Sequence, residues 1–495
     1  MDVNYKVISL QPCSYLDKLF LRGIAKYFCA ELPSIFARNC QVFLRGIAKL
    51  LLSYYDYVFR VKCGIIDCMR KNNENYLPRI VDEEIKNKLD FFGALSLEGC
   101  KWCGKSTTAE QFAGSVIRLQ DPANAPLIEA AKGQPAIILD GDRPRLIDEW
   151  QDLPAIWDAV RSSVDEMHLP GQYLLTGSST PRRNKPRHSG AGRIATIIMR
   201  PMSLYESGDS DGSVSMAKLF DDEDELKGKA NLSLEDIAYL CARGGWPESV
   251  VKKPTNPARI AREYLNAIIG REGSFSELEY YSTGRMRALL RSLARGVSEP
   301  AKLSVVLRDI AENTGTMLSD VTVANYIAIL ERIHIIDDIE AWSPKLRSKT
   351  EIRTGKKRNL VDPSLAVAAL FASDKDLLGD FGSFGLIFES MAMRDLRVYA
   401  EALEGDLMYY RDKNGLECDA IIHLVDGRWG AIEVKLGDGV DVVDGAARNL
   451  LKFREIVDVE KMRKPSFLMV LSGTAKVAYK RPDGVLVVPI GCLKQ

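Results

Sequence analysis

The sequence contains no uninterrupted apolar run of the roughly 18 residues that a membrane-spanning helix needs. It has no excess of charge, since 67 lysines and arginines stand against 67 aspartates and glutamates. It also has no secretory cleavage pattern, and half of its ten cysteines precede Met69. We therefore expect no membrane partner, no disulfide framework and a cytoplasmic location, and the charge balance gives no overall preference for nucleic acid.

The segment Gly99–Ser106 reads GCKWCGKS and matches the phosphate-binding pattern G-x-x-x-x-G-K-[ST] at every required position. It follows a strand-like apolar run, Ala94–Leu97, and precedes a helix expected to end at Phe112. Glycine turns let backbone N–H groups face one anion, and the helix directs its positive end at the same point. The pattern predicts that Lys105 contacts the β- and γ-phosphates of ATP and that Ser106 ligates Mg²⁺. The residues of this loop expected to contact nucleotide are Gly99, Gly104, Lys105, Ser106 and Thr107.

A second apolar run, Arg145–Glu149, ends in the acidic pair Asp148 and Glu149. A nucleotide hydrolase needs one carboxylate to hold Mg²⁺ and another to activate water. We assign the first role to Asp148 and the second to Glu149. A solvated strand end without a catalytic role is the alternative.

A third apolar run, Gln172–Ser179, ends in small hydroxyl residues. It resembles the sensor strand of AAA-type ATPases, which lies between the strands of the phosphate loop and the acidic pair and places a polar side chain near the γ-phosphate. Thr176 and Ser178 are the candidates for that role. The alternative is an ordinary exit from a strand into a loop.

Five strings in order along the chain carry a closer resemblance. They are Glu98–Thr107, Leu146–Gln151, Leu175–Ser178, His188–Arg193 and Met199–Leu204. From about Tyr76 to its end, the chain resembles a family of prokaryotic AAA-type ATP-binding proteins that carry a C-terminal domain of unknown function with a nuclease-like core. The resemblance implies a P-loop fold, ATPase activity, and ATP and Mg²⁺ as cofactors.

Cys100, Cys103 and Arg193 lie within these strings. Cys100 stands where the family more often has proline, which loosens the loop without removing a phosphate donor. Arg193 stands where the family has an arginine that stabilises γ-phosphate charge within one subunit or across a subunit boundary; a plain surface arginine is the alternative. Cys100 and Cys103 form a C-x-x-C, but no second pair has ligand spacing, which disfavours metal or redox chemistry. Oxidation that closes the site stays an open alternative.

Residues 1–68 differ from the rest of the chain. The heptapeptide Phe20–Lys26 recurs identically at Phe43–Lys49, but two copies are too few for a solenoid. Because the resemblance begins near Tyr76, we expect Met69 to be the true start and the preceding segment to be spurious or a poorly ordered extension. A native intact mass that includes Met1 would contradict this expectation.

The middle of the chain has a helical pattern. The expected helices are Leu234–Ala242, Pro257–Ile269, one ending near Val297, Lys302–Glu312 and one capped by Ser319 or Asp320. A break at Gly244–Glu248 resembles the family's lid region. With a strand expected at Ile335–Trp342, the last three helices resemble a winged helix-turn-helix, a module that commonly reads DNA. Because its second helix has few basic residues, packing against protein is favoured over DNA contact.

A strongly basic linker follows this module. Its members are Lys345, Arg347, Lys349, Arg353, Lys356, Lys357 and Arg358. These cations would add a salt-dependent contact to DNA phosphates. A solvated loop of the same composition is an equal alternative.

The C-terminal part contains a second chemical pattern. Asp419 lies in a strand-like run from Glu417 to His423, and the next run, Trp429–Lys435, ends with Glu433 and Lys435 on one face. Two carboxylates with a lysine suit metal-dependent phosphodiester cleavage. In this interpretation Asp419 and Glu433 bind Mg²⁺, and Lys435 orients or deprotonates water.

The same pattern is similar to the core of restriction-endonuclease-like nucleases. Glu389, on an expected helix Leu386–Leu396, matches the acidic residue that such folds often bring from an early helix. A fold does not establish activity, so a structural or inactive nucleic-acid-binding remnant is the alternative to cleavage.

The sequence therefore predicts an α/β protein of about three domains. The predicted parts are an extension of doubtful status (1–68), a P-loop AAA-type ATPase core (69–210), a helical lid with a winged-helix-like module (211–345) and a restriction-endonuclease-like mixed α/β domain (346–495). The predicted function is ATP hydrolysis coupled to a nuclease-like domain acting on nucleic acid. The alternative is a regulatory switch that binds a protein partner or itself, with an inactive C-terminal domain. A metabolic kinase is disfavoured because no small-substrate signature follows the acidic pair.

Overall fold

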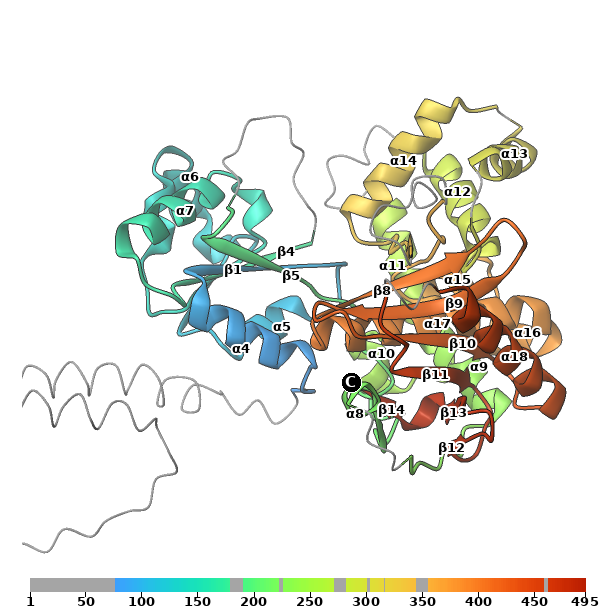
Figure 1. Cartoon of the computed structure of the whole chain (residues 1–495). Helices are drawn as coiled ribbons and strands as arrows, with labels where there is room; N and C mark the ends of the chain where they lie inside the picture. The colour runs from blue at the N-terminus through green and yellow to red at the C-terminus, as the bar shows by residue number, and fades with distance from the viewer. Residues whose placement is uncertain are drawn as a thin grey trace, which may run out of the picture. The chain divides into compact units, whose positions relative to one another are not determined.

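The computed structural model describes residues 76–178, 190–221, 226–270, 282–300, 303–315, 317–343, 355–457 and 462–495, and Figure 1 shows their arrangement. Several sequence predictions lie outside these ranges. They are the repeated heptapeptide, the start at Met69, and the linker residues Lys345, Arg347, Lys349 and Arg353. Within the described part, no helix combines the length and the apolar character that crossing a membrane requires.

A five-stranded parallel sheet forms the first folded part, in the order β2-β3-β4-β1-β5. Its strands are β1 (Ala94–Glu98), β2 (Ser115–Arg118), β3 (Arg145–Asp148), β4 (Tyr173–Gly177) and β5 (Ile194–Ile198). The three apolar runs of the sequence become β1, β3 and β4, and the prediction that the third run lies between the other two is confirmed. The carboxyl ends of these three strands meet at one edge of the sheet.

Helices cover both faces of this sheet, which explains why its strands read as continuous apolar runs. On one face Leu95 packs in a buried cluster with Ile85 and Ala109, and on the other Leu175 packs in a cluster with Val160. The first face carries α4 (Val81–Phe91) and α5 (Lys105–Glu110), and the second carries α6 (Ala125–Gly133), α7 (Ile156–Met167) and the 3₁₀ turn η2 (Pro135–Leu139).

The helix after the phosphate loop, α5, begins at Lys105 as predicted but ends at Glu110 instead of Phe112. The N–H groups of Gln111 and Phe112 bond to carbonyls three residues back, at Thr108 and Ala109. The last turn is therefore a tight 3₁₀ turn, a common way for a helix to end. Two further 3₁₀ turns in this part are η1 (Pro122–Asn124) and η3 (Trp150–Asp152).

The middle of the chain is helical, as predicted. Its elements are β6 (Val214–Ser215), α8 (Met216–Phe220), α9 (Leu234–Arg243), α10 (Pro247–Lys252), α11 (Arg259–Ile269), α12 (Thr283–Arg295), α13 (Leu303–Thr314) and α14 (Asp320–Arg332). The Ser319 side chain caps α14 by accepting a hydrogen bond from the Thr322 N–H, so the predicted cap is confirmed. The predicted break at Gly244–Glu248 is shorter than expected, because α9 ends at Arg243 and α10 already begins at Pro247.

The strand predicted at Ile335–Trp342 is only partly correct. Residues Glu340–Ala341 form a strand, β7, which pairs with the C-terminal sheet at β8 (Gly405–Arg411). Ile339 makes an isolated bridge to Lys357. This apolar run therefore packs against the next part of the chain, and the winged-helix assignment stays a prediction.

A seven-stranded mixed sheet forms the C-terminal part, in the order β12-β13-β11-β10-β9-β8-β7. Its other strands are β9 (Glu417–Leu424), β10 (Trp429–Lys435), β11 (Phe467–Ser472), β12 (Tyr479–Lys480) and β13 (Leu486–Pro489). The predicted strands that carry Asp419 and Glu433 are β9 and β10, which are antiparallel neighbours. The short strand β14 (Leu493–Lys494) pairs with β6.

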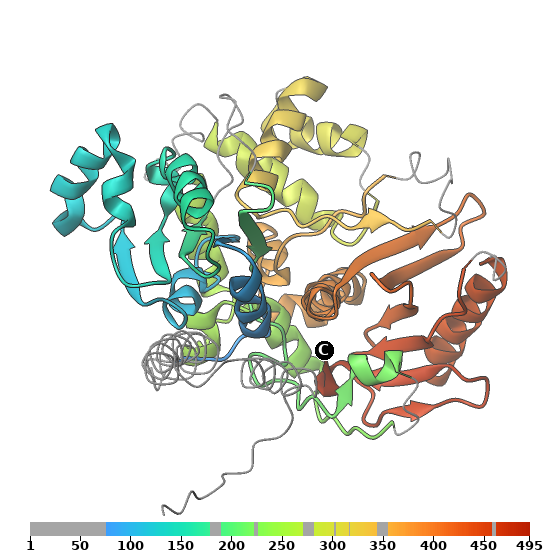
Figure 2. The same cartoon turned by 60° about the vertical axis from the view of Figure 1, so that its left-hand side comes forward.

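Two long helices cover opposite faces of this sheet (Figure 2). Ile432 of β10 lies in one buried cluster with Phe388 of α17 (Phe381–Ala402), whereas its neighbour Ala431 lies in another with Leu450 of α18 (Val440–Ile456). α17 extends beyond the predicted range at both ends. Two shorter helices, α15 (Pro363–Ala369) and α16 (Asp374–Gly379), precede it, and a 3₁₀ turn, η5 (Ile490–Cys492), follows β13.

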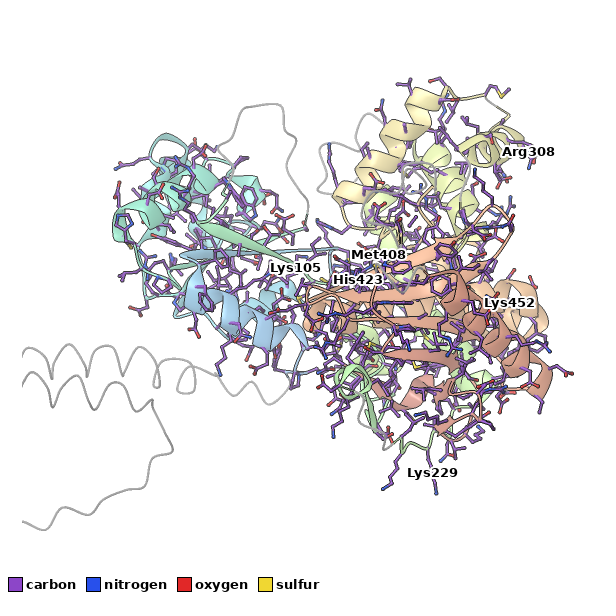
Figure 3. The ribbon with its side chains drawn as sticks, in the orientation of Figure 1. Lys105, Lys229, Arg308, Met408, His423 and Lys452 are labelled. Atoms are coloured by element: carbon purple, nitrogen blue, oxygen red, sulfur yellow. The ribbon has the colours of Figure 1, made fainter. Side chains whose placement is uncertain are left out.

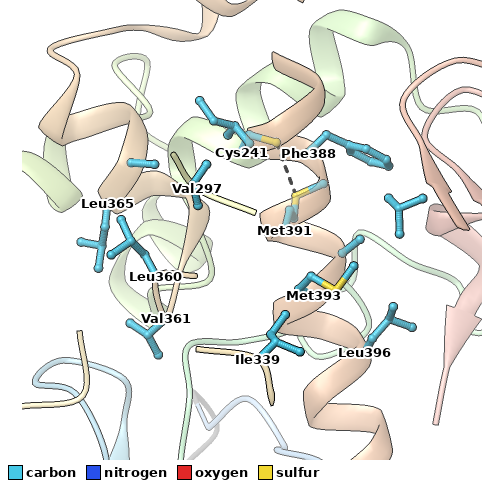
Figure 4. Packing of buried hydrophobic residues seen from close by; sticks show 14 of the residues in the cluster. Cys241, Val297, Ile339, Leu360, Val361, Leu365, Phe388, Met391, Met393 and Leu396 are labelled. Atoms are coloured by element: carbon cyan, nitrogen blue, oxygen red, sulfur yellow. Dashed lines mark hydrogen bonds between the residues drawn. The ribbon is translucent and has the colours of Figure 1, made fainter. Parts of the chain in front are cut away.

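The helix α17 is the centre of the largest buried cluster (Figure 4). Phe388, Met391 and Leu396 are each 0% exposed. The Met391 sulfur lies 3.8 Å from the Cys241 sulfur of α9. Elements from the middle of the chain and from the C-terminal part thus share one core. A rigid helix buried at this point can hold side chains of distant sites at fixed spacing.

Candidate functional site

The loop between β1 and α5 has the backbone of a phosphate cradle. Gly99 and Gly104 adopt φ values of 151° and 103°, which only glycine accepts readily. A Cβ on Gly99 would lie 2.1 Å from the carbonyl oxygen of Met199, so a side chain cannot fit there. Lys105 is buried at the start of α5 (Figure 3), and its Nζ donates to the Cys100 carbonyl at 2.8 Å.

Ser106 and Asp148, the Mg²⁺ ligands predicted for the ATP site, are in contact with each other. The Ser106 Oγ donates to Asp148 Oδ1 at 2.6 Å, and the Thr176 hydroxyl donates to the same oxygen. A hydroxyl and a carboxylate are oxygen donors that suit Mg²⁺, whose remaining positions are usually filled by phosphate oxygens and water. The donor set and the glycine cradle therefore fit Mg²⁺–ATP.

Glu149, the predicted catalytic base, stands in the left-handed backbone region with φ 58°. Such a conformation is costly for a residue with a side chain and is often kept at functional sites. Its Oε2 accepts hydrogen bonds from Ser178 Oγ, at 3.0 Å, and from the amide of Gln151. Both predicted sensor residues thus touch an acid of the pair: Thr176 contacts Asp148, and Ser178 contacts Glu149.

A cleft of about 670 Å³ opens beside this loop. Its lining residues are Lys101, Trp102, Gly104, Lys105, Ser106, Thr107, Gln120, Glu149, Trp246, Pro247, Glu248, Ile260 and Glu263. The volume lies within the range of small-molecule sites. Trp102 of the loop is 50% exposed and packs edge-on against Tyr264, which in turn stacks on Trp246. This aromatic wall was not predicted from the sequence, where a tryptophan inside the phosphate motif was its only signal.

The structure does not bring Arg193 to the phosphate loop of its own chain. Arg193 precedes β5, and Ala94, the first residue of β1, bonds to the Arg193 carbonyl. The loop follows the other end of β1, about 16 Å away at about 3.3 Å per residue. Arg193 instead pairs with Asp165 at 2.7 Å on the surface. The prediction of a role within one subunit is therefore wrong, and a role across a subunit boundary stays a proposal.

A histidine of the middle part lies beside the loop. His334 follows α14, and its Nε2 is 4.0 Å from Oε2 of Glu98, the last residue of β1. Among the described residues this nitrogen finds no hydrogen-bond partner. Burial, together with the cations Lys105 and Arg200, lowers the pKa of His334 to about 4. His334 is therefore neutral at pH 7.

This histidine makes stability depend on pH in a defined direction. Its pKa is lower in the folded state than in the unfolded chain, so the unfolded chain binds more protons between pH 4 and pH 6.5. We expect unfolding free energy to fall by roughly 1 kcal/mol through this group as pH drops from 7.5 to 5.5. Urea titrations at both values should show that fall reduced in His334→Gln but not in His168→Gln, at an exposed histidine. Equal pH dependence in wild type and His334→Gln would contradict the assignment.

The second predicted constellation also comes together. Lys435 Nζ lies 2.7 Å from Glu433 Oε2 and 3.1 Å from Asp419 Oδ2. Asp419 also accepts from the Val434 N–H at 2.9 Å, and Glu433 accepts from the Asn449 amide at 2.7 Å. Asn449 of α18 was not predicted, because nothing in the sequence marks it as a neighbour of β10.

A second lysine, Lys357, enters this acid cluster. It is 1% exposed, pairs with Glu389 of α17, and lies 3.9 Å from Asp419 and from Glu417. Lys357 was predicted to lie in a basic linker that is solvated or binds DNA, and both interpretations are wrong for this buried residue. Of the two linker cations beside it, Lys356 pairs with Glu340 and Arg358 with Asp338.

Burial and mutual repulsion set the charges of the acid cluster. Burial and the charge of Asp419 raise the pKa values of Glu389 and Glu433 to about 7. Burial also opposes ionisation of Asp419, but Lys435 and Lys357 outweigh it and hold its pKa below the usual range. The carboxylates in turn raise the pKa of Lys435 despite its burial. The cluster thus combines a firmly ionised aspartate with two carboxyl groups that titrate near neutrality.

The acid cluster is not arranged as a metal site. In the part of the chain that the structure describes, no group of three or more His, Cys, Asp or Glu side chains is placed to hold a metal ion. The ammonium groups of Lys435 and Lys357 stand against the carboxylates that the sequence analysis assigned to Mg²⁺. Glu389, Asp419 and Glu433 therefore pair with lysines here, and the predicted metal ligation by them does not fit this arrangement.

Buried arginines connect the phosphate loop to the segment after β5. Arg79, before α4, donates to the carbonyl of Cys103 in the loop at 2.9 Å and to that of Arg200 at 2.8 Å. It also pairs with Glu206 at 2.9 Å. The carbonyl of Met199 lies against Gly99, as described above. A movement of the phosphate loop would therefore change its contacts with the segment from Met199 to Arg200.

The same segment is bound to α17. Arg200 is 3% exposed and pairs with Glu401 at 2.6 Å and with Asp337 at 2.7 Å. The Leu204 N–H donates to Asp395 Oδ2 at 3.0 Å. Asp395 and Glu401 belong to α17, the helix that also carries Glu389 of the acid cluster. One helix thus carries Glu389 of the acid cluster and also contacts the segment that lies against the phosphate loop.

Three protein-family models match successive segments of the chain. A family model described as an AAA domain matches residues 92–207, and models described as domains of unknown function match residues 234–376 (DUF8612) and 384–493 (DUF4143). The first match covers β1 to β5 and the phosphate loop. The chain therefore contains an AAA-type ATPase domain, followed by a C-terminal domain of unknown function.

Comparison with individual proteins adds two distant structural likenesses. No curated protein matches the chain. The Walker-type ATPase of Pyrococcus abyssi is 15% identical over 61% of this chain and 97% of its own, with a TM-score of 0.39. A chain from the assembly of Thermococcus gammatolerans McrB AAA+ hexamers with bound McrC is 11% identical over 45% of this chain and 72% of its own, with a TM-score of 0.14.

Proposed function

We propose that the protein hydrolyses ATP at the phosphate loop and that α17 passes the state of this site to the acid cluster, where the C-terminal domain acts on nucleic acid. One observation carries the coupling: α17 bears Glu389 of the acid cluster as well as Asp395 and Glu401, which bind the segment beside the phosphate loop. Glu389 and Glu401 are twelve positions apart, or about 18 Å at 1.5 Å per residue.

The residues of the loop have distinct proposed roles in hydrolysis. Bound ATP with Mg²⁺ supplies the phosphoryl group and the metal that offsets its charge. Lys105 would leave the Cys100 carbonyl and bind the β- and γ-phosphates, while Ser106 and Asp148 hold the metal. Glu149 would take the proton of the attacking water, and Ser178 keeps its carboxylate oriented. An Arg193 from a second copy would be the trans-acting cation.

A specific observation also supports the regulatory alternative. Lys435 and Lys357 neutralise the carboxylates of the acid cluster, and a cluster closed by internal ion pairs suits a structural role. In that case the nucleotide state would act on a protein partner or a second copy, and the C-terminal domain would not cleave. The two functions differ in whether DNA changes ATP turnover and whether DNA is nicked.

The test measures ATP turnover with and without DNA, and nicking of supercoiled plasmid with and without Mg²⁺. We expect DNA to raise turnover and Lys435→Ala to lower nicking at least tenfold, because Lys435 touches both Asp419 and Glu433. Lys452→Ala, at an exposed lysine of α18, is the matched control and should nick at the wild-type rate. ATP turnover that DNA does not change, together with intact plasmid, would remove the nucleic-acid role and leave the switch.

A further inference from the structure

Two cysteines lie together inside the phosphate loop. Cys100 and Cys103 are both 0% exposed, and each thiol lies close enough to the other to influence its ionisation. The Cys103 sulfur also donates to the Met199 carbonyl at 3.4 Å. The proposed hydrolysis uses neither thiol, so this pair is unexplained by that function.

The backbone between the two cysteines suits a disulfide. Lys101 and Trp102 form a turn, and Trp102 has a left-handed φ of 65°. A turn brings Cα atoms three residues apart within about 7 Å, and disulfides span Cα separations of about 4.4 to 6.8 Å. The turn therefore places the two cysteines within the range that a disulfide can span.

The surroundings activate one of the two thiols. Burial opposes ionisation of Cys103, but the hydrogen bond from Cys100 and the cations Lys105 and Arg79 outweigh it and lower its pKa to about 6. Burial raises the pKa of Cys241 in spite of the nearby Arg394, and burial together with the carboxylates of Glu433 and Asp419 raises that of Cys418. The thiolate is the reactive form of cysteine, so Cys103 is suited to react first.

We infer that Cys100 and Cys103 form a redox modification site, at which a small hydroperoxide converts the pair to a disulfide that closes the phosphate loop to ATP. The Cys103 thiolate attacks the peroxide and becomes a sulfenic acid, and the displaced hydroxide takes a proton to leave as water. The Cys100 sulfur then attacks the Cys103 sulfur, loses its proton and releases a second water. Two thiols and one hydrogen peroxide thus give one disulfide and two waters, and the peroxide takes up the two electrons.

Closure follows from what the bond restricts. The backbone N–H groups of the loop must face the phosphates, and Lys105 must leave the Cys100 carbonyl to reach them. A bond between the Cys100 and Cys103 side chains pulls the two ends of the turn together, and this turns the N–H groups away from the arrangement that the cradle needs. The inference rests on the proposed function of this loop as an ATP site, because closure has meaning only there.

The test compares reduced and peroxide-treated full-length protein. We expect hydrogen peroxide to weaken binding of a fluorescent ATP analogue at least tenfold, and dithiothreitol to restore it. Trypsin cleaves after Lys101, so under non-reducing conditions the peptide ending at Lys101 stays joined to Trp102–Lys105 only if the disulfide has formed. Mass spectrometry of this joined peptide reads the bond without reference to ATP.

Two variants make the assignment specific. Each is compared with its own reduced form. Cys100→Ser should lose the reversible fall in affinity, whereas Cys241→Ser, at a buried cysteine of α9, should keep it. Absence of the joined peptide, a joined peptide with unchanged affinity, or a reversible fall that persists in Cys100→Ser would each overturn the inference. If the reduced protein does not bind ATP at all, the proposed function fails, and the peptide still reports whether the disulfide forms.

Discussion

Glu149→Gln is expected to lower ATP turnover by about 10³-fold, within the range that general bases contribute, while ATP affinity stays near wild type. The amide keeps the shape of the side chain and its contact with Ser178 but cannot take a proton from water. Lys105→Ala should instead abolish measurable binding, since it removes the cation aimed at the phosphates. Steady-state turnover and equilibrium binding of ATP distinguish the two effects.

A nearby acid provides the control for this prediction. Glu110 ends α5, and its carboxylate pairs with Arg118 outside the cleft. Glu110→Gln should therefore turn over ATP like wild type. Turnover by Glu149→Gln within fivefold of wild type would mean that another group activates the water, and the left-handed conformation of Glu149 would then have a structural explanation.

Arg394→Met is expected to destabilise the protein by about 3 to 5 kcal/mol, the usual cost of removing one member of a buried ion pair. Arg394 is 1% exposed and pairs with Asp362 at 3.0 Å and with Asp395 at 2.7 Å. Both carboxylates are buried, so the variant leaves two charges without their cation. Urea unfolding at pH 7.5 measures the loss.

The loss should be smaller at low pH. Burial already raises the pKa of Asp395 to about 6, and without Arg394 it rises further. The folded variant then binds a proton that the unfolded chain releases, so its stability falls as pH increases. Arg454→Met, at an exposed arginine of α18, should change stability by under about 0.5 kcal/mol. A loss below 1 kcal/mol in Arg394→Met would contradict the prediction, because it would show that other groups compensate the carboxylates of Asp362 and Asp395.

Contiguous motifs explain what the sequence could predict. Gly99 to Ser106 form one loop, and Asp148 and Glu149 end one strand. The residues of each motif are neighbours in the sequence, so each motif can be recognised without the fold. Parallel pairing of β1, β3 and β4 then brings these ends together without further information. The same reasoning correctly joined Asp419, Glu433 and Lys435, since they lie on two consecutive strands.

Residues joined only by the tertiary fold could not be found in this way. Lys357 reaches Asp419 from more than sixty residues upstream, and its sequence neighbours are basic, which favoured the interpretation as a solvated linker. Arg193 was misplaced for a different reason. It lies in a recognisable string, but the direction of β5 puts it at the opposite end of the sheet from the loop. The metal interpretation of Glu389, Asp419 and Glu433 did not fit because the sequence did not reveal that a second lysine, Lys357, shares their pocket with Lys435.

The tryptophan in the phosphate loop gives the protein an optical reporter of its own. All six tryptophans lie in the described ranges. Trp102 is the exposed one among them, with 50% of its surface accessible, whereas Trp246 and Trp429 are 0% exposed. Acrylamide in solution therefore quenches emission mainly from Trp102. Because this ring lines the cleft, a ligand that fills the cleft shields it, and occupancy becomes readable from intrinsic fluorescence without a label.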